Sequence, residues 1–386
     1  MDRKGMWNPF MRALVLISGL ATAGAERVTV NFLRHIHGTE HRVDACTLTS
    51  RHDGPLAREL EHYGVARYDL GARRLADPGA FARLLALLKC VRPDIIHAHG
   101  QDAAILASAA RLLTSKPLVI TRHVMDEPRE SRRDKLRARM TLWALSRADS
   151  VIAVSKAAAD GLAKITKLPR PKIHVIPNGI ELESFCAAEL EESGLQLREK
   201  FGYDSNHRVV LLPAALRNGK GHDVFFAAIP RLRQQIPSLR VIVAGSGDQE
   251  SNLRECARSF ADCVLFLGEC AQMPQLFHAC DLVVLPSFSE ALPTALIEAA
   301  ASRRPVVATR IGGTPEVVDE NRTGLLVRTN DPDALADAII EMFKNPERLK
   351  TFGSAARAHA EKNFSIELQV ARTLKLWSEV IHRGGR

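Results

Sequence analysis

The stretch Ser289-Glu-Ala-Leu-Pro-Thr-Ala-Leu-Ile-Glu298 decides the predicted fold of this chain. It follows an apolar run at 281–286 that is typical of a buried strand, and it opens a run of helix formers at 295–302. Open α/β sheets bind phosphorylated ligands at such turns, because the helix N-terminus offers free N–H groups and a positive dipole end. Glu290 and Glu298 repel phosphate, so the turn predicts a ligand with a diphosphate and hydroxyls, such as a nucleotide-sugar.

Strand-like apolar runs alternate with helical patterns along the chain, as in parallel α/β folds. The strands expected in the first half are 13–17, 43–47, 95–98, 118–121, 151–154 and 174–176. Those expected in the second half are 209–212, 240–244, 264–267, 282–285, 306–309 and 324–327. Two such sets predict two doubly wound domains joined between Pro177 and Tyr203. A last helical pattern, 365–382, has no strand after it and is expected to pack back across the domain junction.

Length and composition favour two to three globular domains, because the 386 residues are 46% apolar and 25% charged. No apolar run approaches the ~20 residues that span a bilayer. The N-terminus imitates a signal peptide, since basic residues precede the apolar run 13–20 and Ala21-Thr22-Ala23 resembles a cleavage site. A first strand at 12–18 is the favoured interpretation, because the run is short and the α/β pattern continues after it.

Cysteine and charge patterns narrow the partners. The seven cysteines are odd in number and include no Cys-x-x-Cys, which predicts reduced thiols rather than a zinc site or a disulfide framework. The net charge of +9 is uneven: residues 1–180 hold 29 Lys and Arg but 17 Asp and Glu, against 24 and 27 in the rest. Membrane surface, phosphorylated glycolipid and nucleic acid are the candidate anionic partners. Only 5% of residues are aromatic, which counts against base stacking and nucleic acid.

Three loops after expected strands have residues suited to phosphate. In 216–221, Leu-Arg-Asn-Gly-Lys-Gly, the side chains of Arg217 and Lys220 can reach one anion, although a solvated basic loop is the alternative. Gly245, in Ala-Gly-Ser-Gly-Asp, resembles the start of a dinucleotide fingerprint but lacks its third glycine, so it indicates only a tight turn near a nucleotide. Gly24 follows the first strand among small residues that let a ligand approach, or it belongs to an ordinary loop before a helix.

Histidines and a basic helix are further candidates. His97, His99 and His123 lie at strand ends, where a metal site is conceivable but has no acidic ligand pattern; His123 is the best candidate for contact with substrate. The segment 129–147 predicts a basic helix with a narrow apolar stripe at 136, 140 and 143. There are two interpretations of this helix: it binds a membrane surface, or its apolar stripe packs against its own domain. The membrane or acceptor candidates in it are Arg132, Arg133, Lys135, Arg137, Arg139 and Trp143.

These motifs together resemble the retaining glycosyltransferases of family 4, which have the GT-B architecture of two Rossmann-like domains facing across a cleft. The resemblance covers nearly the whole chain, and its specific part is the Glu-x7-Glu spacing of Glu290 and Glu298 with its flanks. The other matching segments are 24–28, 93–99, 148–155, 172–180, 220–223 and 312–318. The implied domains are 1–185 on the acceptor side, 186–364 for the nucleotide-sugar, and a C-terminal helix, 365–386, that packs back on the first domain.

The resemblance also implies roles. Glu290 would lie against the donor sugar, Glu298 would hold the ribose hydroxyls, and Arg217 with Lys220 would neutralise the leaving diphosphate. His123 would contact the sugar. The backbone at Ala291, Leu292 and Thr294 would contact the phosphates, and Gly24 would border them from the other side of the cleft.

The chain departs from the family pattern at two positions. Ala215 stands where a basic residue usually lies five before the lysine, so Arg217 is expected to substitute. Ala291 stands where glycine usually follows the first glutamate, and its methyl group narrows the expected sugar site.

The predicted activity is retaining transfer of a hexose from a nucleotide-diphosphate sugar to a membrane-associated acceptor, a lipopolysaccharide core, glycolipid or other envelope polysaccharide. Same-face attack would be assisted by the leaving phosphate oxygen, and no cofactor or metal is expected. The protein is expected to be cytoplasmic, either free or bound peripherally to the inner face of the cell membrane. The alternatives are a nucleotide-sugar epimerase or a phosphorylase on the same fold, and a non-catalytic membrane-docked scaffold.

Overall fold

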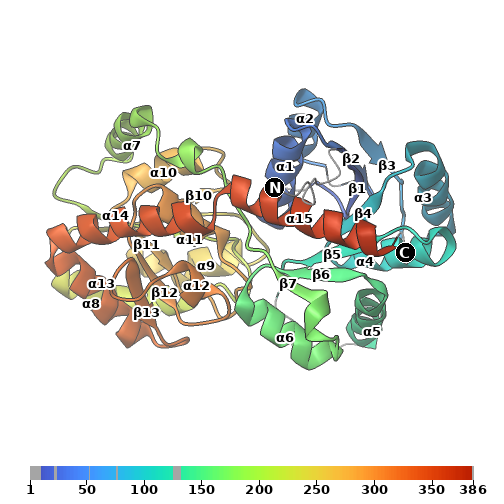
Figure 1. The fold of residues 1–386 in the computed structure, drawn as a ribbon. Helices are drawn as coiled ribbons and strands as arrows, with labels where there is room; N and C mark the ends of the chain where they lie inside the picture. The colour runs from blue at the N-terminus through green and yellow to red at the C-terminus, as the bar shows by residue number, and fades with distance from the viewer. Residues whose placement is uncertain (1–9, 21–23, 52, 75–76, 125–131, 385–386) are drawn as a thin grey trace. The chain divides into compact units, whose positions relative to one another are not determined.

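The chain forms two units, each a parallel sheet with helices between successive strands (Figure 1). The computed structural model describes residues 10–20, 24–51, 53–74, 77–124 and 132–384. The first unit comprises residues 1–179 with 366–386, and the second comprises 180–365. The expectation of two doubly wound, Rossmann-like sheets is therefore confirmed.

The first unit has a seven-stranded sheet in the order β3-β2-β1-β4-β5-β6-β7. Its strands are β1 (Arg12–Ile17), β2 (Arg42–Thr47), β3 (Arg67–Asp69), β4 (Ile95–His99), β5 (Leu118–Arg122), β6 (Ser150–Ala153) and β7 (Ile173–Val175). Its helices are α1 (Gly24–His37), α2 (Pro55–His62), α3 (Pro78–Val91), α4 (Gln101–Thr114), α5 (Arg132–Arg147), α6 (Lys156–Thr166) and α15 (Ile366–Gly384), with a 3-10 turn at Arg170–Lys172. The strand order reverses between β1 and β4, and ligands of open α/β sheets bind outside such a reversal.

Alternate residues of the strands divide the first unit's core into two layers, because successive side chains of a strand point to opposite faces. Ala13 and Val15 of β1 pack with residues of α1, α2 and α15. Leu14 and Leu16 pack with residues of α3, α4 and α5. Both faces are covered, which explains why these strands read as continuous apolar runs.

The C-terminal helix belongs to the first unit, although the whole second unit, 180–365, precedes it in sequence. Trp377 of α15 is fully buried, and its ring meets Phe32 of α1 edge to face with 5.9 Å between centroids. Gln369 accepts a 2.7 Å hydrogen bond from the backbone N–H of Gly179. In Figure 1 the red helix α15 lies among the blue and cyan elements of this unit.

The second unit has a six-stranded parallel sheet in the order β10-β9-β8-β11-β12-β13. Its strands are β8 (Arg208–Pro213), β9 (Leu239–Ala244), β10 (Val264–Gly268), β11 (Leu282–Leu285), β12 (Val306–Thr309) and β13 (Gly324–Val327). Its helices are α7 (Ala188–Lys200), α8 (His222–Gln235), α9 (Glu250–Cys256), α10 (Met273–Ala279), α11 (Thr294–Ala301), α12 (Thr314–Val317), α13 (Pro332–Lys344) and α14 (Pro346–Asn363), with 3-10 turns at Leu182–Phe185 and Arg258–Phe260. Here the order reverses between β8 and β11, so their carboxyl ends mark the expected ligand site.

Twelve expected strands are present within two residues of their predicted ends, and the short strand β3 was not predicted. Its three residues are only partly buried, so no apolar run marks it. The boundary after Gly179 lies six residues before the expected end of the first domain at 185. Arg357 of α14 donates to the carbonyl of Leu182 (2.7 Å) and pairs with Glu183 (2.5 Å), which places both residues in the second unit.

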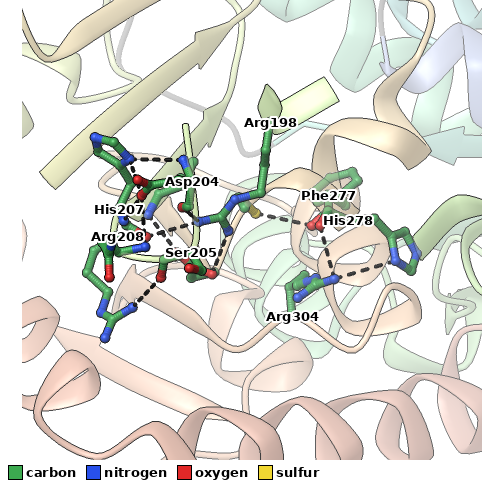
Figure 2. A network of polar contacts seen from close by, with 12 residues as sticks. Arg198, Asp204, Ser205, His207, Arg208, Phe277, His278 and Arg304 are labelled. Atoms are coloured by element: carbon green, nitrogen blue, oxygen red, sulfur yellow. Dashed lines mark hydrogen bonds and ion pairs between the residues drawn. The ribbon is translucent and has the colours of Figure 1, made fainter. Parts of the chain in front are cut away.

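A polar network fastens α7 to the amino edge of the second sheet (Figure 2). Arg198 pairs with Asp281 at 2.8 Å and donates to the carbonyls of Asp204 (3.1 Å) and His207 (3.0 Å). Asp281 also accepts a 2.7 Å hydrogen bond from the N–H of Val209, at the start of β8. The network therefore holds the segment between α7 and β8 against the amino ends of the strands, away from their carboxyl ends.

Candidate active site

A lysine and a glutamate meet where the strand order of the second sheet reverses. Lys220 lies in the loop after β8, and Glu290 lies in the loop after β11. The Nζ of Lys220 donates to Oε1 of Glu290 at 2.6 Å, and the hydroxyl of Ser287 donates to the same oxygen at 2.9 Å. The lysine and glutamate side chains are only 14% and 12% exposed, so this pair is shielded from most of the solvent. The contact therefore joins the basic loop 216–221 to the turn 289–298 that carries Glu290.

The loop after β12 supports Glu290 through its backbone. The N–H of Gly313 donates to the carbonyl of Glu290 at 3.1 Å. Gly312 has φ +45°, and a Cβ there would lie 1.8 Å from the same carbonyl oxygen. Only glycine allows this approach, so the Gly312-Gly313 pair controls the position of the glutamate's backbone.

The loop after β8 packs closely against the loop after β9 and is hydrogen-bonded to it. Leu216 donates its N–H to the carbonyl of Ser246 (2.9 Å) and accepts from the N–H of Gln249 (2.9 Å). A Cβ at Gly245 would lie 2.1 Å from the carbonyl oxygen of Ala214, and one at Gly247 would lie 2.2 Å from that of Leu216. Gly245 thus has a packing role against the basic loop, whereas its contact with a donor remains a prediction. Arg217 lies at the exposed tip of this loop.

The start of α11 lies directly after the glutamate. Ala291 and Leu292 are each 6% exposed, and Thr294 is the first residue of the helix. The first turn of a helix leaves N–H groups free for an anion, which suits the predicted phosphate contacts. Ala291 has a negative φ, unlike the residues with left-handed backbone, so its methyl group costs no backbone strain. Glu298 is half-buried one turn further along α11.

His222 lies beside this site as the first residue of α8. It is 2% exposed, and its Nε2 has no hydrogen-bond partner among the residues that the structure describes. Burial, opposed by Asp223 and assisted by Lys220, lowers the pKa of His222 to about 4. The imidazole is therefore neutral near pH 7.

The first unit brings its own candidates together at the carboxyl ends of β1, β4 and β5. Gly24 begins α1, and His123 follows β5. The ring nitrogens His99 Nδ1 and His123 Nε2 are 3.0 Å apart, and His97 Nε2 lies 2.7 Å from the hydroxyl of Thr121. These histidines contact each other and hydroxyls, and in the described part of the chain no group of three or more His, Cys, Asp or Glu could hold a metal ion.

The basic helix is α5, and its apolar stripe is divided. Met140 and Trp143 pack partly buried against the core of the first unit, whereas Leu136 is 60% exposed. Arg137 pairs with Asp102 of α4, while Lys135 and Arg139 are exposed to solvent. The side chains of Arg132 and Arg133, and residues 129–131, lie outside the described residues. Membrane binding by this helix remains a prediction.

Other expectations concern cysteines and the membrane. All seven cysteines are free thiols. Over the described ranges, no helix has both the length and the apolar character needed to cross a bilayer.

Sequence reasoning missed Ser287 and Thr309 at this site. Ser287 donates to Glu290, and its carbonyl accepts a 2.5 Å hydrogen bond from the hydroxyl of Thr309 at the end of β12. Both are fully buried. The available signal was their place at the carboxyl ends of neighbouring strands, but serine and threonine are common there, so the sequence alone did not single them out.

Comparisons with known proteins agree with this architecture. Residues 22–184 match the family described as Glycosyltransferase Family 4, and residues 207–345 match Glycosyl transferases group 1. The D-inositol 3-phosphate glycosyltransferase of Pseudarthrobacter chlorophenolicus is 30% identical over 311 residues, which cover 76% of this chain and 72% of that protein. A GDP-mannose-dependent monoacylated alpha-(1-6)-phosphatidylinositol monomannoside mannosyltransferase of Corynebacterium glutamicum is 32% identical over 211 residues, but they cover only 52% of this chain and 55% of that relative.

Solved structures show the same fold. Anabaena HepE in complex with UDP and glucose has a TM-score of 0.85 at 23% identity, covering 95% of this chain and 99% of that one. The sucrose-phosphate synthase of Thermosynechococcus elongatus has a TM-score of 0.77 at 20% identity, covering 97% and 100%. At these identities the likeness concerns the fold alone.

Proposed function

We propose a reaction for this chain, which belongs to glycosyltransferase family 4: it moves a hexose, with retention, from a nucleotide-diphosphate sugar to a hydroxyl of a membrane-associated glycan or glycolipid. The observation that carries the proposal is the Lys220–Glu290 contact at the strand-order reversal of the second sheet. It sets an ammonium group beside a carboxylate, and this pairing supports a diphosphate at Lys220 and a sugar at Glu290. The relatives named above support a sugar-nucleotide donor, since one is GDP-mannose-dependent and HepE was solved with UDP and glucose.

The leaving diphosphate would be stabilised by positive charge from three sources. Breaking the bond between the sugar and the diphosphate leaves an oxocarbenium-like sugar and an anion. Lys220, Arg217 and the first turn of α11 would offset that negative charge without a metal ion. Because Lys220 donates to Glu290, a bound diphosphate would have to share or take over this cation.

Retention would follow from attack on the same face of the sugar. A retaining mechanism with a protein nucleophile needs a carboxylate free to bond to the anomeric carbon. Oε1 of Glu290 accepts hydrogen bonds from Lys220 and Ser287, which hold the carboxylate in one orientation and support a role in orienting the sugar. The leaving phosphate oxygen would then take the proton from the acceptor hydroxyl.

The acceptor half of the proposal rests on charge and exposure in the first unit. That half of the sequence holds 29 Lys and Arg against 17 Asp and Glu. Lys135, Arg139 and the exposed Leu136 of α5 offer cationic and apolar groups to an anionic lipid surface. A cytoplasmic enzyme at the inner face of the membrane would meet a lipopolysaccharide-type or other envelope acceptor there.

A donor screen tests the proposal. Thermal-shift measurements with uridine, guanosine and adenosine diphosphate sugars should find at least one stabilising donor, which the protein then hydrolyses slowly or transfers to a lipid extract. The anomeric configuration of the product, read by NMR, should equal that of the donor. Failure of all common donors would contradict the proposal, and conversion of a donor into an isomeric nucleotide-sugar without any acceptor would indicate an epimerase.

Variants of the central pair sharpen this test. Glu290→Gln should keep donor binding and lower kcat by about 100-fold, because a preorganised charge beside the reacting sugar is lost. Lys220→Ala should weaken donor and nucleoside diphosphate binding as well. The surface pair Lys350–Glu347, 3.3 Å apart on α14, provides matched controls in Glu347→Gln and Lys350→Ala, which should leave activity unchanged.

A further inference from the structure

The segment that follows β11 is held by both of the strands that flank it. Strand β11 lies between β8 and β12 in the second sheet. On the β8 side, the N–H of Phe288 donates to the carbonyl of Gly219 at 2.8 Å. On the β12 side, the hydroxyl of Thr309 donates to the carbonyl of Ser287 at 2.5 Å. The backbone on which the Ser287 side chain stands is therefore fixed from two directions.

The hydroxyl of Ser287 gives its hydrogen to Glu290. The glutamate Oε1 lies 2.9 Å away and, as a carboxylate oxygen, accepts. A serine hydroxyl has one hydrogen, so this contact uses its whole capacity to donate. Ser287 is 0% exposed and Thr309 is 2% exposed, so these two hydroxyls are covered from solvent and from any ligand in the site.

Glu290 has a second contact at the same oxygen, and a diphosphate affects the two contacts differently. The Nζ of Lys220 donates to Oε1 at 2.6 Å. An ammonium group is attracted to phosphate oxygens, so a diphosphate in the proposed site competes with the carboxylate for Lys220. The Ser287 hydroxyl is neutral and covered, so the diphosphate does not compete for it. The serine contact is thus the one that persists when the donor binds.

The other oxygen of the carboxylate is left for a ligand. Among the residues that the structure describes, Oε2 of Glu290 has no hydrogen-bond partner. The side chain is 12% exposed, so the carboxylate is not closed off completely. With Oε1 fixed by Ser287, Oε2 keeps one direction and can accept from a sugar hydroxyl.

We propose that Ser287 and Thr309 are positioning residues, which keep the Glu290 carboxylate in its sugar-binding orientation while a diphosphate draws Lys220 away from it. This step rests on the proposed function, in which Lys220 meets the diphosphate and Glu290 meets the sugar. The orientation of the glutamate is then set by two covered hydroxyls that never touch the ligand.

Crystal structures of full-chain variants separate the two contacts without any ligand. Lys220→Met keeps the aliphatic stem and removes the ammonium group, as a bound diphosphate would. In that variant the carboxylate of Glu290 should stay within hydrogen-bond distance of Ser287. In Lys220→Met combined with Ser287→Ala it should leave this position. A carboxylate that leaves Ser287 in Lys220→Met, or that keeps its place in the double variant, would overturn the proposal.

Steady-state kinetics with the donor found in the screen gives a second readout. Ser287→Ala should lower kcat by about 10-fold, as expected for one lost hydrogen bond to a charged group, and should leave nucleoside diphosphate affinity within about 2-fold. General damage would weaken diphosphate binding as well, because the loop that carries Lys220 is hydrogen-bonded to this segment. An unchanged kcat, or an equal loss of diphosphate affinity, would overturn the proposal.

A double variant tests whether Ser287 acts through the glutamate. In Glu290→Ala there is no carboxylate to hold, so adding Ser287→Ala should cause no further loss of kcat. A further loss of about 10-fold would mean that the serine acts on the reaction by another route, which would contradict the proposal.

Thr309 is tested through the serine that it supports. Thr309→Val has nearly the same shape but no hydroxyl, and it should lower kcat by about 3-fold, since the carbonyl of Ser287 loses its donor. Thr309→Ser restores the hydroxyl and should recover the wild-type value. Equal kcat in Thr309→Val and wild type would overturn the role of Thr309.

Matched controls remove buried hydroxyls elsewhere in the second unit. Ser302 follows α11 and is 1% exposed, and Thr323 is 2% exposed with its hydroxyl donating to the carbonyl of Asp319 at 3.2 Å. Ser302→Ala and Thr323→Val should leave kcat unchanged. Losses as large as those in Ser287→Ala and Thr309→Val would show that any missing buried hydroxyl has this effect, and the proposal would be wrong.

Failure of this inference is distinguishable from failure of the proposed function. If no donor binds the wild-type chain, the proposed function fails, while the Lys220→Met structures still decide whether Ser287 holds the carboxylate. If a donor is turned over but Ser287→Ala behaves as wild type, the function stands and the positioning role is wrong.

Discussion

Individual side chains of the second unit acquire their chemistry from residues distant in sequence. Glu290 and Lys220 are 70 positions apart, yet their side chains form a 2.6 Å ion pair. The sequence predicted both residues as participants, because each follows an apolar run and lies before a helical pattern. It did not predict that Ser287 shares the glutamate oxygen, since that contact depends on side-chain directions after β11.

His222 predicts a pH dependence of stability. Its pKa is about 4 in the folded chain against an ordinary value of 6.5, so below pH 6.5 the unfolded state binds the extra proton first. This contribution to stability is complete above pH 6.5 and is lost as the pH falls toward 4, by roughly 3 kcal/mol. Between pH 7 and pH 5, the midpoint temperature of thermal denaturation should therefore fall more steeply for the wild type than for His222→Asn. If the midpoint temperatures of the two proteins fall in parallel with pH, groups other than His222 control the pH dependence of stability.

At the scale of elements, the loop between β12 and α12 is predicted to position the turn that contains Glu290. Gly312→Ala would set a methyl group against the carbonyl of Glu290, so the loop must shift and take the glutamate with it. We expect loss of donor turnover by at least about 10-fold with a folded chain, measured by hydrolysis and circular dichroism.

Gly202→Ala is the matched control for that variant. Gly202 also has a positive φ, +75°, but its added Cβ would meet nothing within 4 Å. It should cost only the roughly 1–2 kcal/mol of left-handed backbone strain and leave turnover intact. Equal activity loss in both variants would mean that backbone strain, rather than the contact with Glu290, is responsible.

Helix α15 is predicted to be essential to the first unit's core. Trp377→Ala removes a fully buried ring between Phe32 and His97, and should destabilise that unit by about 3–5 kcal/mol. Denaturant titration monitored by far-UV circular dichroism, a signal that does not depend on the removed tryptophan, measures the change in unfolding free energy. Leu113→Ala, at a position 68% exposed, is the control and should have little effect. A loss of stability in Trp377→Ala no larger than that in Leu113→Ala would contradict the prediction that this buried ring stabilises the unit.

At the scale of the molecule, the uneven charge predicts that the protein binds an anionic membrane surface. Replacing Lys135 and Arg139 together by glutamate should weaken binding to anionic phospholipid vesicles by about 30-fold or more, since each basic residue near such a surface contributes ~1 kcal/mol. Flotation of vesicles at low and high salt measures this, and added salt should weaken wild-type binding.

The control for the membrane prediction reverses two exposed arginines of the second unit. Arg258 and Arg322 have side chains 77% and 75% exposed, and their replacement by glutamate should leave vesicle binding unchanged. If both double variants lose binding equally, net charge and not α5 would govern the association.

The sequence by itself determined the alternation of strands and helices, the two doubly wound sheets and the Glu-x7-Glu turn. Apolar periodicity and strand-to-helix turns are local properties, so Leu282–Leu285 and Val306–Thr309 were predicted to the residue. Only the tertiary structure decided that Lys220 meets Glu290, that the carbonyl of Glu290 leaves no room for a Cβ at Gly312, and that His99 contacts both Thr29 and His123. Those contacts join residues from different strands and loops, and their distances follow from strand order and packing, which no local pattern contains.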